Sequence, residues 1–240
     1  MNLKSPEYPG RVIVIGMPPS GRHVLAAYAV TGRSASSQAR KIIFDGDAAW
    51  VRPTDEEILS QGNPDLLIYP AVIYGDGIAV GNGKQTETLG KALSSHDDPV
   101  AALAAAHGVW EYEPDAPNFT PRISGCLKSP EKAALGIVKR DGAGNPVRQY
   151  FEFALEPGEG RMIATYTGEN RDPLPAFQGE PVQVSIKSET AAEAAGELYD
   201  ALAPGERGRD FRVSAFCLFS SLSDPGKIEM GIVNRHEEER

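Results

Sequence analysis

Short apolar runs separated by turn residues dominate the first third of the chain and predict β-hairpins. "RVIVIG" and "HVLAAYAV" flank "MPPSGR", whose proline and glycine content is typical of a turn. "LLIYPAVIY" and "IAVGN" flank Gly-Asp-Gly, a strong hairpin signal. The strands predicted in this part of the chain are 11–16, 23–30, 41–44, 49–51, 66–74 and 78–82.

Helical spacing then replaces the alternating pattern. "TETLGKALSS" predicts a short helix over 86–95, and the Ala-rich "DPVAALAAAHG" predicts a second one with Asp98 as its N-cap. The clearest amphipathic segment is 190–202, where Thr190 or Ser188 would cap the helix.

Further strands surround this last helix. They are predicted at 133–140, 147–155, 162–168, 182–188, 211–221 and 228–235. Runs of strands, then helices, then strands again are typical of an α+β fold with mainly antiparallel sheets. Two sheets packed face to face with helices outside would bury these strands. No composition break or repeat divides the chain, so we expect one domain over 1–240.

Composition and charge narrow the classes of function. The chain is 41% hydrophobic and 24% charged, and its net charge of −9 argues against general nucleic-acid binding. No stretch approaches the length of a membrane span. Cys126 and Cys217 are far apart, which fits a reducing compartment. We therefore expect a cytoplasmic protein without a nucleic-acid or membrane partner.

Two polar loops carry residues suited to binding an anion. "GRSASSQAR" combines Arg33 and Arg40 with serine hydroxyls, a set suited to a phosphate. The alternative is a solvated loop whose arginines pair with surface acids. "GNGKQTET" places Gly83 and Lys84 before a predicted helix, where backbone N–H groups favour an anion or oxyanion. An ordinary glycine turn explains this pattern equally well.

Proton-transfer candidates lie on other segments. Tyr69 stands in an apolar strand, where a structural tyrosine is the default and a proton donor is the alternative. "WEYEPDAPNF" holds Glu111, Glu113 and Asp115, of which one could be a general base. Arg122 follows a proline, which stiffens the backbone that presents its guanidinium.

The sequence contains no motif typical of a metal-dependent enzyme or of a serine hydrolase. The four histidines show no metal-ligand spacing, and neither HExxH nor GxSxG is present. The sequence therefore predicts no metal site.

The ordered blocks of the chain resemble the archaeal-type IMP cyclohydrolase family. These blocks are "YPGRVIVIG", "AYAVTGRSASSQAR", "NPDLLIYPAV" with "GNGKQTET", "PNFTPRISG", "GIVKRDG" and "TYTGENRDPLPAF". The resemblance implies a four-layer αββα sandwich like that of N-terminal-nucleophile hydrolases. It also implies closure of 5-formamidoimidazole-4-carboxamide ribotide (FAICAR) to IMP with loss of water. The partner would be this purine ribotide, and orienting its two reacting groups requires no cofactor.

The resemblance also implies site residues. The catalytic positions would be Tyr69, Lys84, Glu113 and Arg122. The substrate-binding positions would be Arg33, Arg40, Asn82, Gly83 and Thr120. Glu113 is the best match to the family's carboxylate upstream of Thr-Pro-Arg. The sequence leaves open which carboxylate near Thr120-Pro121-Arg122 takes part in catalysis.

Two other functions are compatible with the same fold. One is a purine-nucleotide-binding protein that has lost the chemistry. The other is an amide hydrolase with another substrate, which would need a maturation cut because "MNLKSPEYPGR" begins without a Cys, Ser or Thr nucleophile. The sequence leaves the formation of a homo-oligomer open.

Overall fold

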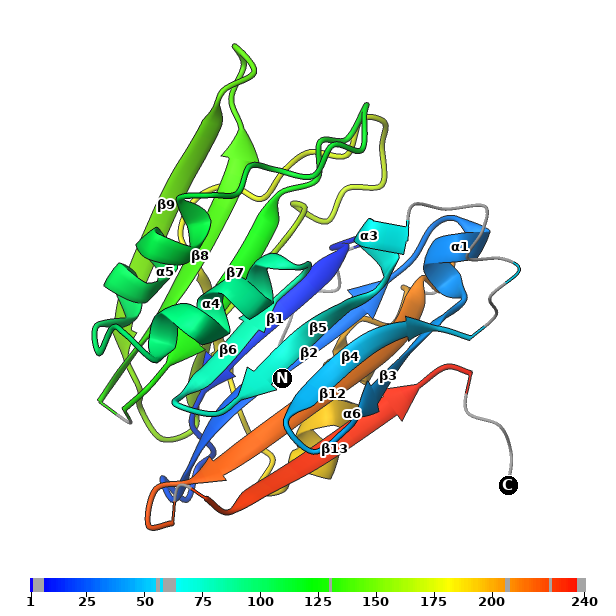
Figure 1. Ribbon diagram of the computed structural model, residues 1–240. Coiled ribbons are helices and arrows are strands. Elements are labelled where there is room, and N and C mark those ends of the chain that lie inside the picture. The colour runs from blue at the N-terminus through cyan, green and yellow to red at the C-terminus, as the bar shows by residue number, and fades with distance from the viewer. Residues whose placement is uncertain are drawn as a thin grey trace.

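Two antiparallel sheets form the frame of the protein, as a computed structural model shows (Figure 1). This confirms the predicted α+β class with mainly antiparallel sheets. The structure describes residues 1, 7–54, 57, 64–129, 131–205, 208–224 and 226–236.

The larger sheet has seven strands in the order β3-β4-β5-β6-β7-β8-β9, so each strand pairs with its neighbour in sequence. Its strands are β3 (Arg40–Phe44), β4 (Ala48–Pro53), β5 (Tyr69–Tyr74), β6 (Ile78–Gly81), β7 (Arg122–Leu127), β8 (Lys132–Arg140) and β9 (Pro146–Ala154). Tight turns join several of these strands. At the β5–β6 turn the Gly75 amide donates to the Gly77 carbonyl at 3.0 Å.

The smaller sheet has six strands in the order β11-β10-β1-β2-β12-β13, which brings the two ends of the chain together. Its strands are β1 (Arg11–Gly16), β2 (His23–Thr31), β10 (Glu159–Ala164), β11 (Val182–Ser185), β12 (Arg212–Ser221) and β13 (Ile228–Asn234). Every strand pair in both sheets runs antiparallel within the described residues.

The hydrophobic core lies where the two sheets face each other. The central strands β1 and β2 are buried along almost their whole length, as near-continuous apolar runs require. The sheets approach each other closely at Gly125, where a β-carbon would lie 2.7 Å from Cδ1 of Ile15 in the facing sheet. Tyr28 and Tyr69 cross this core from opposite sheets and share a hydroxyl hydrogen bond of 2.7 Å.

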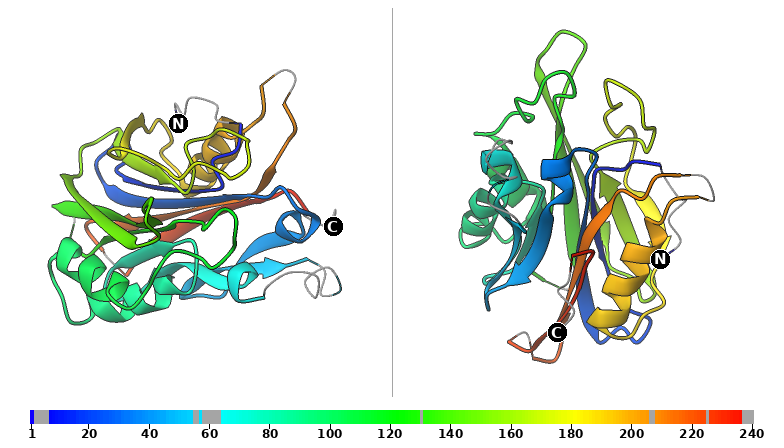
Figure 2. Two further views of the ribbon diagram at one scale, coloured as in Figure 1. Left: turned by 90° about the horizontal axis from the view of Figure 1, so that it is seen from above. Right: turned by 90° about the vertical axis from the view of Figure 1, so that its right-hand side faces the viewer.

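Helices cover the outer face of each sheet. The helices α4 (Gln85–Leu93) and α5 (Pro99–His107) pack on the seven-stranded sheet, and α6 (Ala191–Ala201) packs on β12 and β13. Figure 2 shows α4 and α5 in green on one side of the paired sheets and α6 in gold on the other. Among the described residues, we find no helix that combines the length and the hydrophobicity of a membrane span.

The N-caps predicted for the second and third helices are confirmed. The Asp98 carboxylate accepts a hydrogen bond of 2.7 Å from the Ala101 amide, and the Thr190 hydroxyl accepts one of 3.2 Å from the Glu193 amide. Thr190, rather than Ser188, is therefore the N-cap of α6.

Several predicted boundaries are wrong. The strand expected over 66–74 begins only at Tyr69, because Pro64–Leu67 form the short helix α3. The strand expected over 162–168 is Glu159–Ala164, and the one expected over 182–188 ends at Ser185. The loop expected over 32–40 contains a helical turn, α1 (Ala35–Gln38), which Ser34 caps. Short polar turns of this kind carry no periodic apolar signal.

The contact between α6 and β13 depends on a glycine. A β-carbon at Gly231 would lie 2.3 Å from the Ala191 carbonyl oxygen, whereas one at Gly196 on α6 would meet nothing within 4 Å. Gly231→Ala is therefore expected to lower the free energy of unfolding by about 1–3 kcal/mol. Gly196→Ala should raise it by about 0.5–1 kcal/mol, because alanine favours a helix. Urea denaturation measures both, and an unchanged Gly231→Ala variant would contradict this packing.

Candidate active site

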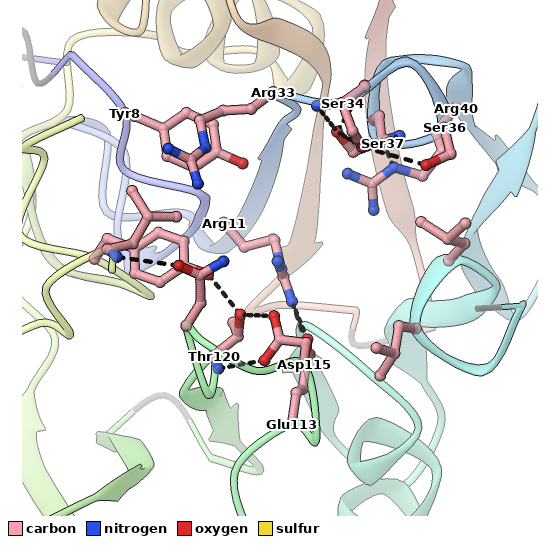
Figure 3. Close-up of a pocket in the computed structure, with 15 residues that line it drawn as sticks. Tyr8, Arg11, Arg33, Ser34, Ser36, Ser37, Arg40, Glu113, Asp115 and Thr120 are labelled. Carbon is pink, nitrogen blue, oxygen red and sulfur yellow. Dashed lines mark hydrogen bonds and ion pairs between the residues drawn. The ribbon is translucent and has the colours of Figure 1, made fainter. Parts of the chain in front are cut away.

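Antiparallel pairing brings distant parts of the sequence to one end of the two sheets. The starts of β1, β3, β5 and β7 and the ends of β2, β6 and β10 all lie there, since neighbouring strands reverse direction. A cavity of about 270 Å³ opens at this end (Figure 3). It is lined by Tyr8, Arg11, Arg33, Ser34, Ser36, Ser37, Arg40, Leu66, Leu67, Glu113, Asp115, Asn118, Thr120, Tyr166 and Leu174.

One side of the cavity is cationic and rich in hydroxyl groups. Ser34, Ser36 and Ser37 gather there around the start of α1 (Figure 3). Arg40 is 3% exposed, and its Nε donates to the Ser37 carbonyl at 2.8 Å. The Arg33 guanidinium lies 5.3 Å from the centre of the Tyr8 ring. The structure thus brings both predicted anion-binding arginines and the serines to one wall.

Arg33 also has a partner on the loop after β10. Its Nη2 lies 2.9 Å from an oxygen of Asp172, and its Nη1 donates to the Asn170 side chain at 3.2 Å. The Asp172 side chain is 75% exposed, so this pair is solvated and weak. A ligand anion can replace such a carboxylate at little cost.

The deeper side of the cavity holds a buried ion pair. Nη2 of Arg11, at the start of β1, donates to both oxygens of Glu113 at 2.7 and 2.8 Å. Arg11 and Glu113 are only 9% and 2% exposed. The loop that carries Glu113 closes on itself, because the Glu113 amide donates to the Thr120 carbonyl at 2.8 Å.

Burial and charge oppose each other in this pair. Burial disfavours the charged guanidinium, but Glu113 and the hydroxyls of Tyr69 and Tyr166 outweigh it, so the pKa of Arg11 is raised well above its ordinary value. Burial also raises the pKa of Glu113 above 4.5, while Arg11 and Arg122 act against that rise. The result is a fixed cation beside a carboxylate that is a better base than a solvated one.

Two further residues hold Glu113 from behind. Nδ2 of Asn82 lies 3.4 Å from a Glu113 oxygen, and Nη1 of Arg122 lies 4.0 Å from the same oxygen. Arg122 is fixed by hydrogen bonds to the Glu111 carbonyl and the Gln85 side chain. Its guanidinium also lies 4.7 Å from the centre of the Trp110 ring. Arg122 is therefore aimed at the Glu113 carboxylate rather than into the open cavity.

A second polar chain lines the wall beside this ion pair. The Thr120 hydroxyl donates to Oδ2 of Asp115, and the Thr120 amide donates to Oδ1 at 2.6 Å. The Thr120 hydroxyl also lies 2.5 Å from the Tyr166 hydroxyl. Figure 3 shows Thr120 and Asp115 next to Glu113 and facing the same space.

Comparison with known proteins shows which family has this sequence pattern. A family model described as IMP cyclohydrolase-like protein matches residues 8–220. The chain belongs to the IMP cyclohydrolase-like family. That match runs through nearly every element described above.

Three similar proteins carry the name IMP cyclohydrolase. One from Natronomonas pharaonis is 29% identical over 228 residues, which cover 95% of this chain and 98% of that protein. One from Methanopyrus kandleri is 31% identical over 182 residues, covering 71% of this chain and 89% of that protein. One from Haloquadratum walsbyi is 30% identical over 194 residues, covering 80% and 84%.

The site residues expected from the IMP cyclohydrolase resemblance fall into three groups by their position relative to the cavity. Four of them line the cavity: Arg33, Arg40, Glu113 and Thr120. Asn82 and Arg122 lie behind Glu113, and Gly83 lies beside Arg122, where a β-carbon would sit 2.7 Å from Nη1 of that arginine. Tyr69 and Lys84 form the third group, outside the lining.

Tyr69 and Lys84 differ from the others in their access to the cavity. Tyr69 is fully buried, and its hydroxyl bonds to Tyr28. Lys84 is exposed at the start of α4 and is not among the described residues that line the cavity. Their predicted catalytic roles stay predictions.

Arg11, Tyr8 and Tyr166 are among the lining residues of this IMP cyclohydrolase-like chain that the sequence did not single out. Arg11 stands at the first position of an apolar strand, where an arginine carries no specific signal. Tyr8 lies just before the strand predicted over 11–16, and Tyr166 lies inside the strand predicted over 162–168. Each of the three lies next to the end of β1 or β10, so strand ends are the sequence signal that could have found them.

Proposed function

We propose that this protein closes FAICAR to IMP with release of water, in purine biosynthesis. The family match and the three relatives named IMP cyclohydrolase support the reaction. The observation that carries the proposal is one cavity with a cationic, hydroxyl-rich wall at one side and a buried Arg11–Glu113 pair at the other. A phosphorylated substrate with a reacting amide needs both.

The cationic wall is assigned to the 5′-phosphate of the substrate. Arg33 and Arg40 supply planar donors, and Ser34, Ser36 and Ser37 supply hydroxyls. Binding the phosphate at this wall directs the imidazole toward Arg11 and Glu113. Since FAICAR carries both reacting groups on one ring, holding them in a reactive orientation is a large part of the catalysis.

Glu113 is assigned to the carboxamide nitrogen. It takes a proton from this nitrogen as the nitrogen bonds to the formyl carbon. Arg11 faces the oxygen of that carbon and stabilises the negative charge that develops on it. Asn82 and Arg122 keep the Glu113 carboxylate in place from behind. We assign no step to Lys84 or Tyr69.

We also propose a finer description of the fold. The order of α4 and α5, two sheets and α6 matches a four-layer αββα sandwich of the N-terminal-nucleophile-hydrolase type. The shared core supports one domain over 1–240, since residues of both sheets belong to a single apolar cluster.

The direct test of the proposed reaction is turnover. Purified protein is supplied with FAICAR, and IMP formation is followed by ultraviolet absorbance. We expect IMP to form in proportion to enzyme concentration. If the folded protein forms no IMP, the proposal that it is an IMP cyclohydrolase is rejected. If IMP then still raises the melting temperature, the chain is a nucleotide-binding protein without this activity.

Arg33→Ala tests the placement of the phosphate. Losing one charge-assisted contact should raise KM by about 10-fold or more and change kcat little, because the contact is the same in the ground and transition states. Steady-state kinetics with FAICAR measures both constants. Arg171→Ala, which lies between Asn170 and Asp172 in the sequence and is paired with Glu169 at the surface, is the matched control. A fall in kcat at unchanged KM would instead indicate that Arg33 contacts the reacting groups of the substrate.

A further inference from the structure

We propose that Tyr166, Thr120 and Asp115 form a second proton path, in which Tyr166 contacts the reacting end of the substrate and Thr120 and Asp115 act through it. This inference rests on the proposed cyclisation. It assigns a catalytic role to Tyr166 and positioning roles to Thr120 and Asp115.

The stoichiometry of the reaction calls for such a path. Cyclisation removes one proton from the carboxamide nitrogen and one from the formamide nitrogen, and both depart with the formyl oxygen as water. Glu113 takes the first proton and returns it to the formyl oxygen, and both of its oxygens are bonded to Arg11. A second acceptor beside the first lets the second N–H bond break while the C–O bond is breaking.

The hydrogen-bond donors of the chain have a fixed order. A carboxylate only accepts hydrogen bonds, so the single Thr120 hydroxyl proton points at Asp115. Thr120 then accepts from Tyr166, whose own proton points at Thr120. The lone pairs of the Tyr166 oxygen are left to accept a proton from the cavity. Three groups thus form a directed path from the cavity to the Asp115 carboxylate.

Burial suits two of the three members to this role. Thr120 is fully buried and Tyr166 is 3% exposed, whereas Asp115, at the end of the path, is half-buried. Burial also raises the pKa of the Tyr166 hydroxyl above 10, so it stays protonated at neutral pH and passes a proton on without ionising. Tyr166 and Asp115 both line the cavity together with Glu113.

The step balances in atoms and electrons. The lone pair of the carboxamide nitrogen first forms the ring bond to the formyl carbon. The π electrons of the formyl C=O bond move to its oxygen, and this oxygen receives the proton that Glu113 returns. The formamide N–H proton next passes to the Tyr166 oxygen, as the Tyr166 proton passes to Thr120 and the Thr120 proton to Asp115. The N–H pair forms the C=N bond, the C–O bond breaks, and the reversed path supplies the proton that completes water.

The experiment compares variants that break the path at different points. Tyr166→Phe, Thr120→Val and Asp115→Asn are each expected to lower kcat by about 100-fold or more. KM and the Kd for IMP should stay within about twofold, since the phosphate wall is untouched. Thr120→Ser keeps the hydroxyl and should restore most of the activity. The double variant Tyr166→Phe/Asp115→Asn should be no slower than either single one, because residues that act as one path are not additive.

A matched control uses a tyrosine outside the cavity. The Tyr112 hydroxyl donates to the Gly144 carbonyl at 2.9 Å, and Tyr112→Phe should leave kcat unchanged. Wild-type kcat in Tyr166→Phe, with wild-type enzyme active, overturns the second path and leaves the proposed function standing. Additive losses in the double variant also overturn it. Absence of turnover in the wild type rejects the proposed function instead. If Asp115→Asn does not fold, Tyr166→Phe decides.

Discussion

Replacing Arg11 with methionine is expected to lower the free energy of unfolding by about 3–5 kcal/mol. The reason is that Glu113 is 2% exposed and would lose the guanidinium that bonds both of its oxygens. Asn82 and Arg122, at 3.4 and 4.0 Å, replace only part of that contact. Methionine keeps the unbranched shape of the side chain, so the loss reports on charge rather than on a cavity. Urea denaturation monitored by circular dichroism measures it.

The decrease in the free energy of unfolding caused by Arg11→Met should depend on pH. Burial raises the folded-state pKa of Glu113 above its unfolded value, and Arg11 opposes that rise. A carboxyl group with a raised folded pKa stabilises the fold at low pH and loses this contribution as pH rises through the folded pKa. Removing Arg11 enlarges the rise, so the deficit of Arg11→Met should be larger at pH 8 than at pH 5.

Two controls separate the buried pair from general charge effects. Arg11→Met/Glu113→Leu removes both charges and should recover much of the stability lost in the single variant. Arg171→Met breaks an exposed pair with Glu169 and should change stability little. A double variant less stable than Arg11→Met, or a deficit independent of pH, would contradict the account of this ion pair.

Glu113→Gln should have the largest effect on turnover, a fall in kcat of about 10²–10⁴-fold. Glutamine keeps the size of the side chain and an oxygen for Arg11, but it cannot take a proton from the carboxamide nitrogen. The phosphate wall is unchanged, so IMP should bind with a Kd within about threefold of the wild-type value. Single-turnover kinetics with FAICAR and calorimetric titration with IMP measure the two effects.

Glu111→Gln is the matched control for this substitution. Glu111 lies two residues earlier in the same loop, its side chain is exposed, and only its carbonyl contacts the site. It should therefore turn over FAICAR at the wild-type rate. Equal losses in the two variants would show that loop charge, rather than the Glu113 carboxylate, controls the reaction.

Much of the frame could be predicted from the sequence, because alternation and turn chemistry are local. Strand 11–16 is found as predicted, and the helix expected over 190–202 lies at Ala191–Ala201 with its expected cap at Thr190. Helix α3 could not be predicted. Its Leu66 and Leu67 lead into an apolar strand, and a short apolar run does not distinguish helix from strand.

The site was predictable where its chemistry is local and unpredictable where it depends on burial. Arg33 and Arg40 lie in one polar loop with the serines, so their grouping could be inferred. Glu113 and Glu111 lie in the same loop, but only Glu113 is buried and paired with Arg11, which lies 102 residues away in sequence. Contacts of this kind arise from the pairing of strands in the sheets, which periodicity does not specify.

The central claim is that this cavity binds a phosphorylated purine ribotide in one orientation, and a crystal structure of the protein with IMP tests it most directly. We expect the phosphate within hydrogen-bonding distance of Arg33, Arg40 or the α1 serines, with C2 of the purine facing Arg11 and Glu113. A second cavity of about 260 Å³ lies at the opposite end of the sheets, beside Val24 and Leu127. IMP bound there, or bound with its phosphate on Glu113, would contradict the account.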